Sequence, residues 1–70
     1  MRSTMDLKRI VAAGGGLILD CSKLSSTEIK AIATSAKAPV ILKNTGELST
    51  MDMKAIAAAG NGYIIFDLCN

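Results

Sequence analysis

Three segments of the chain share one pattern of polar and hydrophobic positions. Each opens with Ser-x-x-acid, continues with an apolar residue, Lys, a variable residue and Ile, and closes on a short aliphatic run. The opening tetrapeptides are Ser3–Asp6, Ser25–Glu28 and Ser49–Asp52. The pattern therefore predicts a single domain, residues 1–70, built from three copies of one unit: residues 3–24, 25–48 and 49–70.

The opening tetrapeptides predict helix starts. A Ser hydroxyl can accept a hydrogen bond from the backbone N–H three residues on, while the acidic side chain returns to the Ser backbone N–H. The apolar positions that follow, such as Leu7, Ile10 and Val11, recur at the spacing of one helix face. Small residues indicate that the helices pack closely on their neighbours: Ala33, Ala36, Ala57 and Ala58.

Glycines and one proline predict where these helices end. The first helix should end at Gly14, the second near Lys37 and before Pro39, and the third at Gly60. Glycine suits the left-handed backbone that follows a helix, and proline cannot continue a helix. The glycine runs do not suit a phosphate-binding loop, because such a loop follows a strand and precedes a helix.

The aliphatic runs predict the strands of a parallel sheet. They are short and unbroken, as in strands that helices cover, and they lie at residues 17–19, 40–42 and 63–66. A helix between successive strands provides the crossover that parallel pairing requires. We therefore expect an α/β fold with a three-stranded sheet. Two strand orders are open, because chain order leaves one sheet face bare whereas order 2-1-3 places helices on both faces.

The closing part of the first two units resembles the leucine-rich repeat. The matching positions are Leu17-x-Leu19-x-x-Ser22-x-Leu24-Ser25 and, one residue longer, Val40-x-Leu42-x-x-Thr45-x-x-Leu48-Ser49. Unit length and the combination of one strand with one helix are also similar. In that family an Asn or Cys stands where this chain has Ser22 and Thr45, and its side chain ties the turn together. The resemblance implies a protein-binding scaffold without catalytic activity of its own.

If the strands lie in chain order, the face of the sheet without helices carries three isoleucines. Alternation along the strands directs Ile18, Ile41 and Ile65 away from the helices. Soluble proteins seldom leave such a patch in water, so we expect a cover, and we favour a second copy in a twofold dimer over an unknown protein partner. The open strand edges also invite pairing, and a fragment of a longer repeat protein is the alternative.

Charged residues follow the strands at the end where parallel sheets usually bind ligands. Asp20, Lys43 and Asp67 align as acid, base and acid. Two interpretations are open: a charge ladder that sets strand register, which we favour, and a small-molecule or catalytic site. Two flanking carboxylates would hold the lysine in its charged form, in which it is neither a nucleophile nor a base. No residue is assigned as catalytic.

The helices carry a basic column that is a candidate nucleic-acid contact: Lys8, Arg9, Lys30 and Lys54. The acidic residues that open the helices lie one short step away and would cancel much of its field. The net charge of +2 comes from basic residues without a basic block or interleaved aromatics, so the sequence does not favour nucleic acid as a partner. We interpret the column as a solvated helix face.

The composition of the chain disfavours metal sites, cofactor sites and membrane spans. The chain has no His and no Cys-x-x-Cys, so we expect neither a metal site nor a cofactor. Cys21 and Cys69 suit small buried hydrophobes in a reducing cytoplasm, and a disulfide between them is the alternative. No apolar run approaches the ~18 residues that span a membrane, so we expect a soluble cytoplasmic protein.

The amino-terminal third also has the outline of a bacterial lipoprotein signal. Basic residues at Arg2, Lys8 and Arg9 precede an apolar run, and Cys21 follows it. The acid directly before that Cys and the recurrence of the same pattern downstream disfavour this interpretation. No motif in the chain identifies a function, and we expect a non-enzymatic interaction or self-assembly module.

Overall fold

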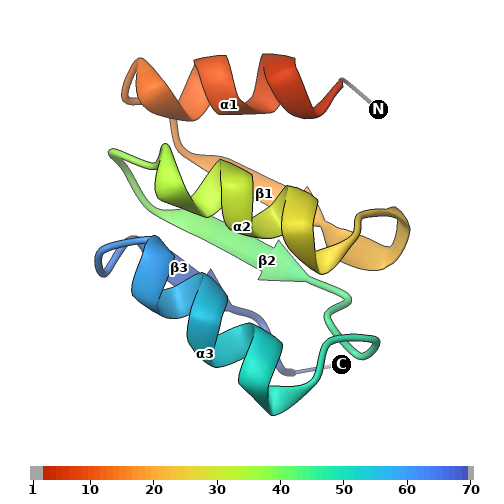
Figure 1. Ribbon diagram of the computed structural model, residues 1–70. Helices are drawn as coiled ribbons and strands as arrows, with labels where there is room; N and C mark the ends of the chain where they lie inside the picture. Colours follow the sequence, from red (N-terminus) through yellow and green to blue (C-terminus); the bar gives the residue numbers. More distant parts are fainter. Residues whose placement is uncertain (1–2, 70) are drawn as a thin grey trace.

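Helix and strand alternate along the chain. The computed structural model describes residues 3–69, so Met1, Arg2 and Asn70, with the ends of the expected domain, lie outside the described residues. The elements are α1 (Thr4–Ala12), β1 (Leu17–Asp20), the 3-10 turn η1 (Cys21–Lys23), α2 (Ser26–Thr34), β2 (Val40–Lys43), α3 (Thr50–Ala59) and β3 (Ile64–Phe66). The three strands form one open parallel sheet in the order β1-β2-β3 (Figure 1). The α/β fold is confirmed, and the alternative order 2-1-3 is wrong.

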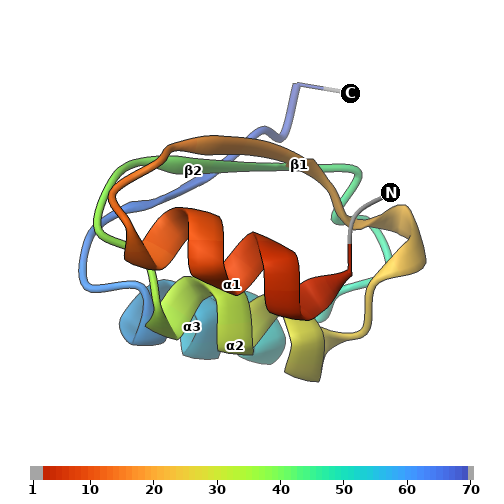
Figure 2. The same ribbon diagram turned by 90° about the horizontal axis from the view of Figure 1, so that it is seen from above.

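All three helices lie on the same side of the sheet. Figure 2 shows two layers, with the sheet above and α1, α2 and α3 below it. The strand register is the same across both pairs, since Leu17 lies beside Val40 and Val40 beside Ile64. Each side chain of β2 therefore stands in a row with its equivalents in β1 and β3. Within residues 3–69, none of the helices has the length and apolar character that a membrane crossing needs.

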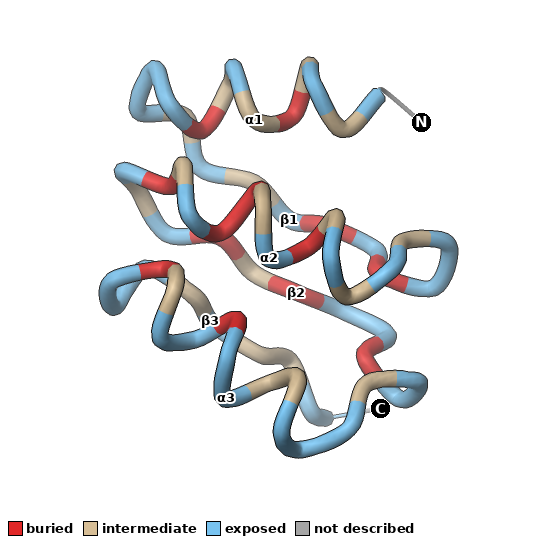
Figure 3. Tube along the Cα trace, viewed as in Figure 1, coloured by how far each residue is buried: buried red, intermediate tan, exposed pale blue. Residues whose placement is uncertain are grey.

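The core lies between the two layers, and α2 is central to it (Figure 3). The largest side chains with under 2% exposure are Ile29, Ile32, Leu42, Ile56, Val11 and Val40. Ala33 and Ala36 are buried, as their small size suggested. The same expectation was wrong for Ala57 and Ala58, which are exposed. They belong to α3, which ends the helical layer and has a helix neighbour on one side only.

The three serines begin the helices as their pattern predicts. The side chains of Ser3, Ser25 and Ser49 accept hydrogen bonds from the backbone N–H three residues on. Only the second start is a full capping box, because the Ser25 N–H donates to Glu28 Oε1 at 3.1 Å. The other oxygen of Glu28 accepts a hydrogen bond from the Thr4 hydroxyl at 2.8 Å. Glu28 therefore both caps α2 and ties it to α1.

Replacing Glu28 by Gln should make the free energy of unfolding less dependent on pH under acidic conditions. The Ser25 N–H, then the Thr4 hydroxyl, hold the pKa of Glu28 below its ordinary value of 4.5. The folded state therefore gains stability from ionised Glu28 above pH 4.5, and loses it as the pH falls through the lower folded pKa. Urea unfolding at pH 7 and pH 3 should show a smaller difference for Glu28→Gln than for the parent chain.

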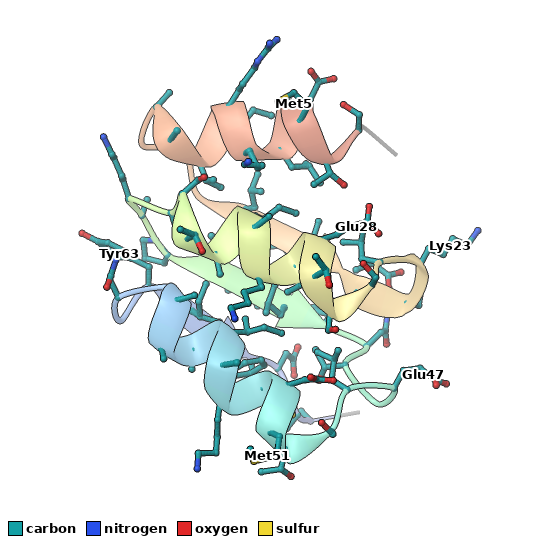
Figure 4. All side chains as sticks on the ribbon, in the orientation of Figure 1. Met5, Lys23, Glu28, Glu47, Met51 and Tyr63 are labelled. Atoms are coloured by element: carbon teal, nitrogen blue, oxygen red, sulfur yellow. The ribbon has the colours of Figure 1, made fainter. Side chains whose placement is uncertain are left out.

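Glu47→Gln is the matched control, since Glu47 lies exposed on the loop before α3 (Figure 4). It removes a carboxylate but leaves the contacts of Glu28 with Ser25 and Thr4 in place, so the contribution of Glu28 to the pH dependence should remain. Glu28→Gln should still lose some stability as the pH falls, because the pKa of Asp20 is also lowered, first by the hydrogen bond from the Ser22 N–H. If the parent chain and Glu28→Gln lost the same stability between pH 7 and pH 3, the role of this carboxylate in joining α1 to α2 would be contradicted.

The ends of α1 and α3 agree with the sequence, whereas that of α2 differs. Gly14 follows α1 with φ +97°, the conformation that favours glycine. α2 ends earlier than expected, at Thr34. Gly60 ends α3 as expected but with φ −83°, and the left-handed backbone follows it, at Asn61 with φ +52° and Gly62 with φ +87°. A Cβ atom on Gly60 would collide with the side chain of Ile64, so this glycine is needed for close approach of β3.

Candidate functional site

The sheet face opposite the helices is uncovered. Ile18 is 70% exposed and Ile65 is 48% exposed, with the partly buried Ile41 between them. The strand register sets Ile18 beside Ile41 and Ile41 beside Ile65. These three side chains, which we call the isoleucine row, form a continuous apolar strip across the sheet.

The contrast between the two sheet faces follows from alternation along each strand. In β1, Leu19 is 5% exposed beneath the helices, whereas its neighbour Ile18 is among the most exposed apolar residues. In β2, Val40 and Leu42 are buried against the helices. The chain therefore supplies apolar side chains to both faces but helices to only one.

Two further rows flank the isoleucine row on the bare face, because residues two before and two after each Ile share its side of the sheet. The amino row consists of Gly16, Pro39 and Tyr63, which directly precede the strands. The ladder continues to this row, because the Leu17 N–H donates to the Pro39 carbonyl and the Val40 N–H to the Tyr63 carbonyl. The carboxyl row consists of Asp20, Lys43 and Asp67, the last directly after β3 with its N–H donating to the Leu42 carbonyl. Tyr63, labelled in Figure 4, is 39% exposed at the amino end of β3. All the charge of this face therefore lies at its carboxyl end.

The side chains of the carboxyl row stand side by side, but Lys43 forms an ion pair with only one of its two acidic neighbours. Asp20 lies beside Lys43 in the register, yet among residues 3–69 only Lys43 and Asp67 form an ion pair, with Nζ and Oδ2 3.7 Å apart. Asp20 Oδ1 instead accepts from the Ser22 N–H at 2.9 Å and from the Asn44 side-chain amide at 3.1 Å. These hydrogen bonds, led by that of the Ser22 N–H, lower the pKa of Asp20. Asn44, not Lys43, is thus its cross-strand partner.

An open depression of about 610 Å³ lies beside the carboxyl row. Asp67, Glu47 and Thr45, the last a buried residue of only 6% exposure, are among the residues that line it. Asp20 and Lys43 are not part of the lining. Across residues 3–69, no group of three His, Cys, Asp or Glu side chains is placed to hold a metal ion. The walls of the depression are mixed, because Leu48, Met53 and Leu68 line it beside these polar residues.

Replacing Lys43 by Met should separate the two interpretations of the carboxyl row. The side chains of Lys43 and Asp67 are 46% and 26% exposed, so solvent screens their attraction and the pair should contribute only about 0.2–1 kcal/mol. A thermal-shift screen of metabolites should find no ligand whose binding Lys43→Met abolishes. If a metabolite bound the parent chain but not Lys43→Met, and the two were equally stable, the row would be a ligand site. The charge-ladder interpretation would then be wrong.

The basic column lies on the helical layer, on the opposite side from the isoleucine row. Arg9, Lys30 and Lys54 are exposed and Lys8 is half-buried. A shallow groove between α2 and α3 is lined by both Lys30 and Asp52, so charges of opposite sign share it. A phosphate backbone would meet an acid there at the same time as a base.

The two cysteines differ in environment, and both are free. Burial, and then the nearby Asp20 carboxylate, raise the pKa of the Cys21 thiol to about 11. Cys21 is therefore a protonated, unreactive thiol at neutral pH, buried as expected. The same expectation was wrong for Cys69, which is exposed. Two methionines at the start of α3 also differ, because Met53 is half-buried and Met51 is 73% exposed.

Sequence reasoning missed the loop residues that organise the carboxyl ends of the strands. Asn44 adopts φ +57° and reaches from the end of β2 to Asp20. Asp20 accepts from the Ser22 N–H and so begins η1, which was not predicted. The Asp-x-Ser sequence is a signal for such a turn, and Asn is a residue that tolerates a left-handed backbone.

Comparison with known proteins leaves the chain without an assigned family. No protein-family model matches it, and neither a curated protein nor a solved structure matches it. The likeness to leucine-rich repeats is therefore supported only as a succession of helix-strand units that share one parallel sheet. Any function has to be argued from the surfaces of this molecule itself.

Proposed function

We propose that this protein is a non-enzymatic assembly module that associates with a second copy of itself through the bare sheet face. The observation that carries the proposal is the isoleucine row, in which Ile18 and Ile65 are 70% and 48% exposed. Apolar area in contact with water is unfavourable, and burying it is the main driving force of most protein association. An apolar strip of neighbouring side chains suits a protein surface, whereas small ligands bind mostly in concave pockets.

Self-association through the strand edges is a weaker way to complete the fold. Edge pairing would satisfy backbone groups but would leave the isoleucine row in water. Head-to-tail stacking, with β1 of a second copy beside β3, would also continue the register by one unit. Asp67 would then stand beside Asp20 of that copy, and like charges on neighbouring strands repel.

The size of the face sets the expected strength of association. Three strands at about 4.8 Å spacing and five residues at about 3.3 Å each give a surface of roughly 14 by 16 Å. This is well below the ~800 Å² per partner of a standard stable interface. We therefore expect a weak, reversible dimer.

Methyl NMR on dilution tests the proposal directly. On dilution from millimolar to low micromolar concentration, the isoleucine methyl signals of Ile18, Ile41 and Ile65 should shift together along one binding curve. The methyl signals of Ile29 and Ile32, which are 1% exposed between the layers, are the internal control and should stay in place. Signals of the isoleucine row that do not depend on concentration would refute self-association through this face.

A further inference from the structure

We infer that the second copy lies face to face with its strands antiparallel, related by a twofold axis that runs across the strands through the Ile41 position. This inference rests on the proposed function. It goes further by fixing which residues meet. In this arrangement β1 faces β1 of the second copy, β2 faces β2, and β3 faces β3. The isoleucine row then meets itself, with Ile18 opposite Ile18 and Ile65 opposite Ile65.

The charges of the bare face distinguish this arrangement from the parallel one. All three charged side chains of the face stand in the carboxyl row. A twofold axis along the strands would stack one carboxyl row on the other. Lys43 would then meet Lys43, and Asp20 would meet Asp67 of the second copy. Each of these pairs brings like charges together in a partly dehydrated contact, which is unfavourable.

The antiparallel arrangement avoids these contacts because it places each carboxyl row over the uncharged amino row. Lys43 comes opposite Pro39, where its aliphatic stem can cover the ring while the ammonium stays in water. Asp67 comes opposite Tyr63, and a phenol hydroxyl is a donor for a carboxylate. The face is thus self-complementary under one of the two twofold operations that stack aligned sheets.

Cross-linking through one accessible cysteine tests the arrangement in the full chain. The variants are Ile18→Cys, Ile65→Cys and Ile41→Cys, each combined with Cys69→Ser. The buried Cys21 can stay, since its thiol is inaccessible. A short bismaleimide that spans the ~10 Å between stacked sheets is added at millimolar protein concentration. For mixtures, one variant carries a mass tag so that products of unlike chains are recognised.

The antiparallel dimer predicts that Ile18→Cys cross-links to itself and Ile65→Cys cross-links to itself. A mixture of these two variants should give few products that join unlike chains. The parallel dimer predicts the reverse, with Ile18→Cys joined to Ile65→Cys and little self-linking of either. Ile41→Cys lies on the axis in both arrangements and should cross-link to itself in either, so it reports whether the sheet faces meet at all.

The outcomes separate this inference from the proposed function. Products mainly between unlike chains would overturn the antiparallel arrangement and leave self-association through the face intact. Cross-linking of Ile41→Cys with no preference among the other products would also overturn it. A chain that stays monomeric by sedimentation, with no product from any variant, would overturn the proposed function and this inference together.

Discussion

Replacing Ile18 by Asp should abolish self-association while leaving the monomer folded. Ile18 is 70% exposed in the monomer, so the substitution removes little that supports the fold. Burying an aliphatic side chain is worth about 1.5–3 kcal/mol, and a twofold dimer contains the position twice. A carboxylate buried in the contact adds a further cost. We expect the dissociation constant to rise by about a hundredfold or more.

Met51→Asp is the matched control for this substitution. Met51 is 73% exposed, it undergoes the same change from an apolar to an acidic residue, and it lies on α3, away from the sheet face. Size-exclusion chromatography with light scattering at several concentrations should show unchanged self-association for Met51→Asp. Equal effects of the two substitutions would mean that net charge, and not the isoleucine row, controls association.

Replacing Leu42 by Ala should unfold a large fraction of the molecules. Leu42 is 1% exposed at the centre of the sheet, beneath the helices, and such truncations cost about 2–5 kcal/mol. A domain of 70 residues has a total stability of only roughly 4–10 kcal/mol. The loss should appear in urea unfolding followed by circular dichroism, as a lower midpoint or as a chain without a folded baseline.

Ile41→Ala is the control in the same strand. Ile41 is the neighbour of Leu42 but belongs to the bare face, where its truncation opens no cavity beneath the helices. Measured at low protein concentration, Ile41→Ala should cost clearly less than Leu42→Ala. Equal losses for the two variants would contradict the assignment of one covered and one bare sheet face.

The succession of elements could be predicted because the chain repeats itself. A single Ser-x-x-acid tetrapeptide is a weak signal, but three in register, each followed by helical spacing, specify three helix starts. The starts at Ser3, Ser25 and Ser49 are all confirmed. The alignment of copies also gave the strand register, since equivalent residues of successive units lie side by side.

The errors arose where neighbours in space decide the role of a residue. Ala57 is exposed although its equivalent Ala33 is buried, because α3 has no helix beyond it. Gly60 marks the helix end as expected, but its role comes from contact with Ile64 in β3 and not from its own backbone angle. Local sequence carries no direct record of such contacts.

The sequence predicted which residues form the isoleucine row but not whether the row is covered. Period-two alternation identified Ile18, Ile41 and Ile65 as one row, but it could not decide between a bare face and a covered one. That choice depends on strand order, which is a property of the whole fold. The partner of Asp20 was also out of reach, because Asn44 finds it by adopting a left-handed backbone.

Sedimentation equilibrium of the unmodified chain is the most direct test of self-association. We predict that the weight-average mass rises from 7.3 kDa at low micromolar concentration toward twice that value at about 1 mM, in a single monomer–dimer equilibrium. A mass that stays at 7.3 kDa up to the highest concentration would contradict the proposal. The isoleucine row would then face water and not a second copy of the chain.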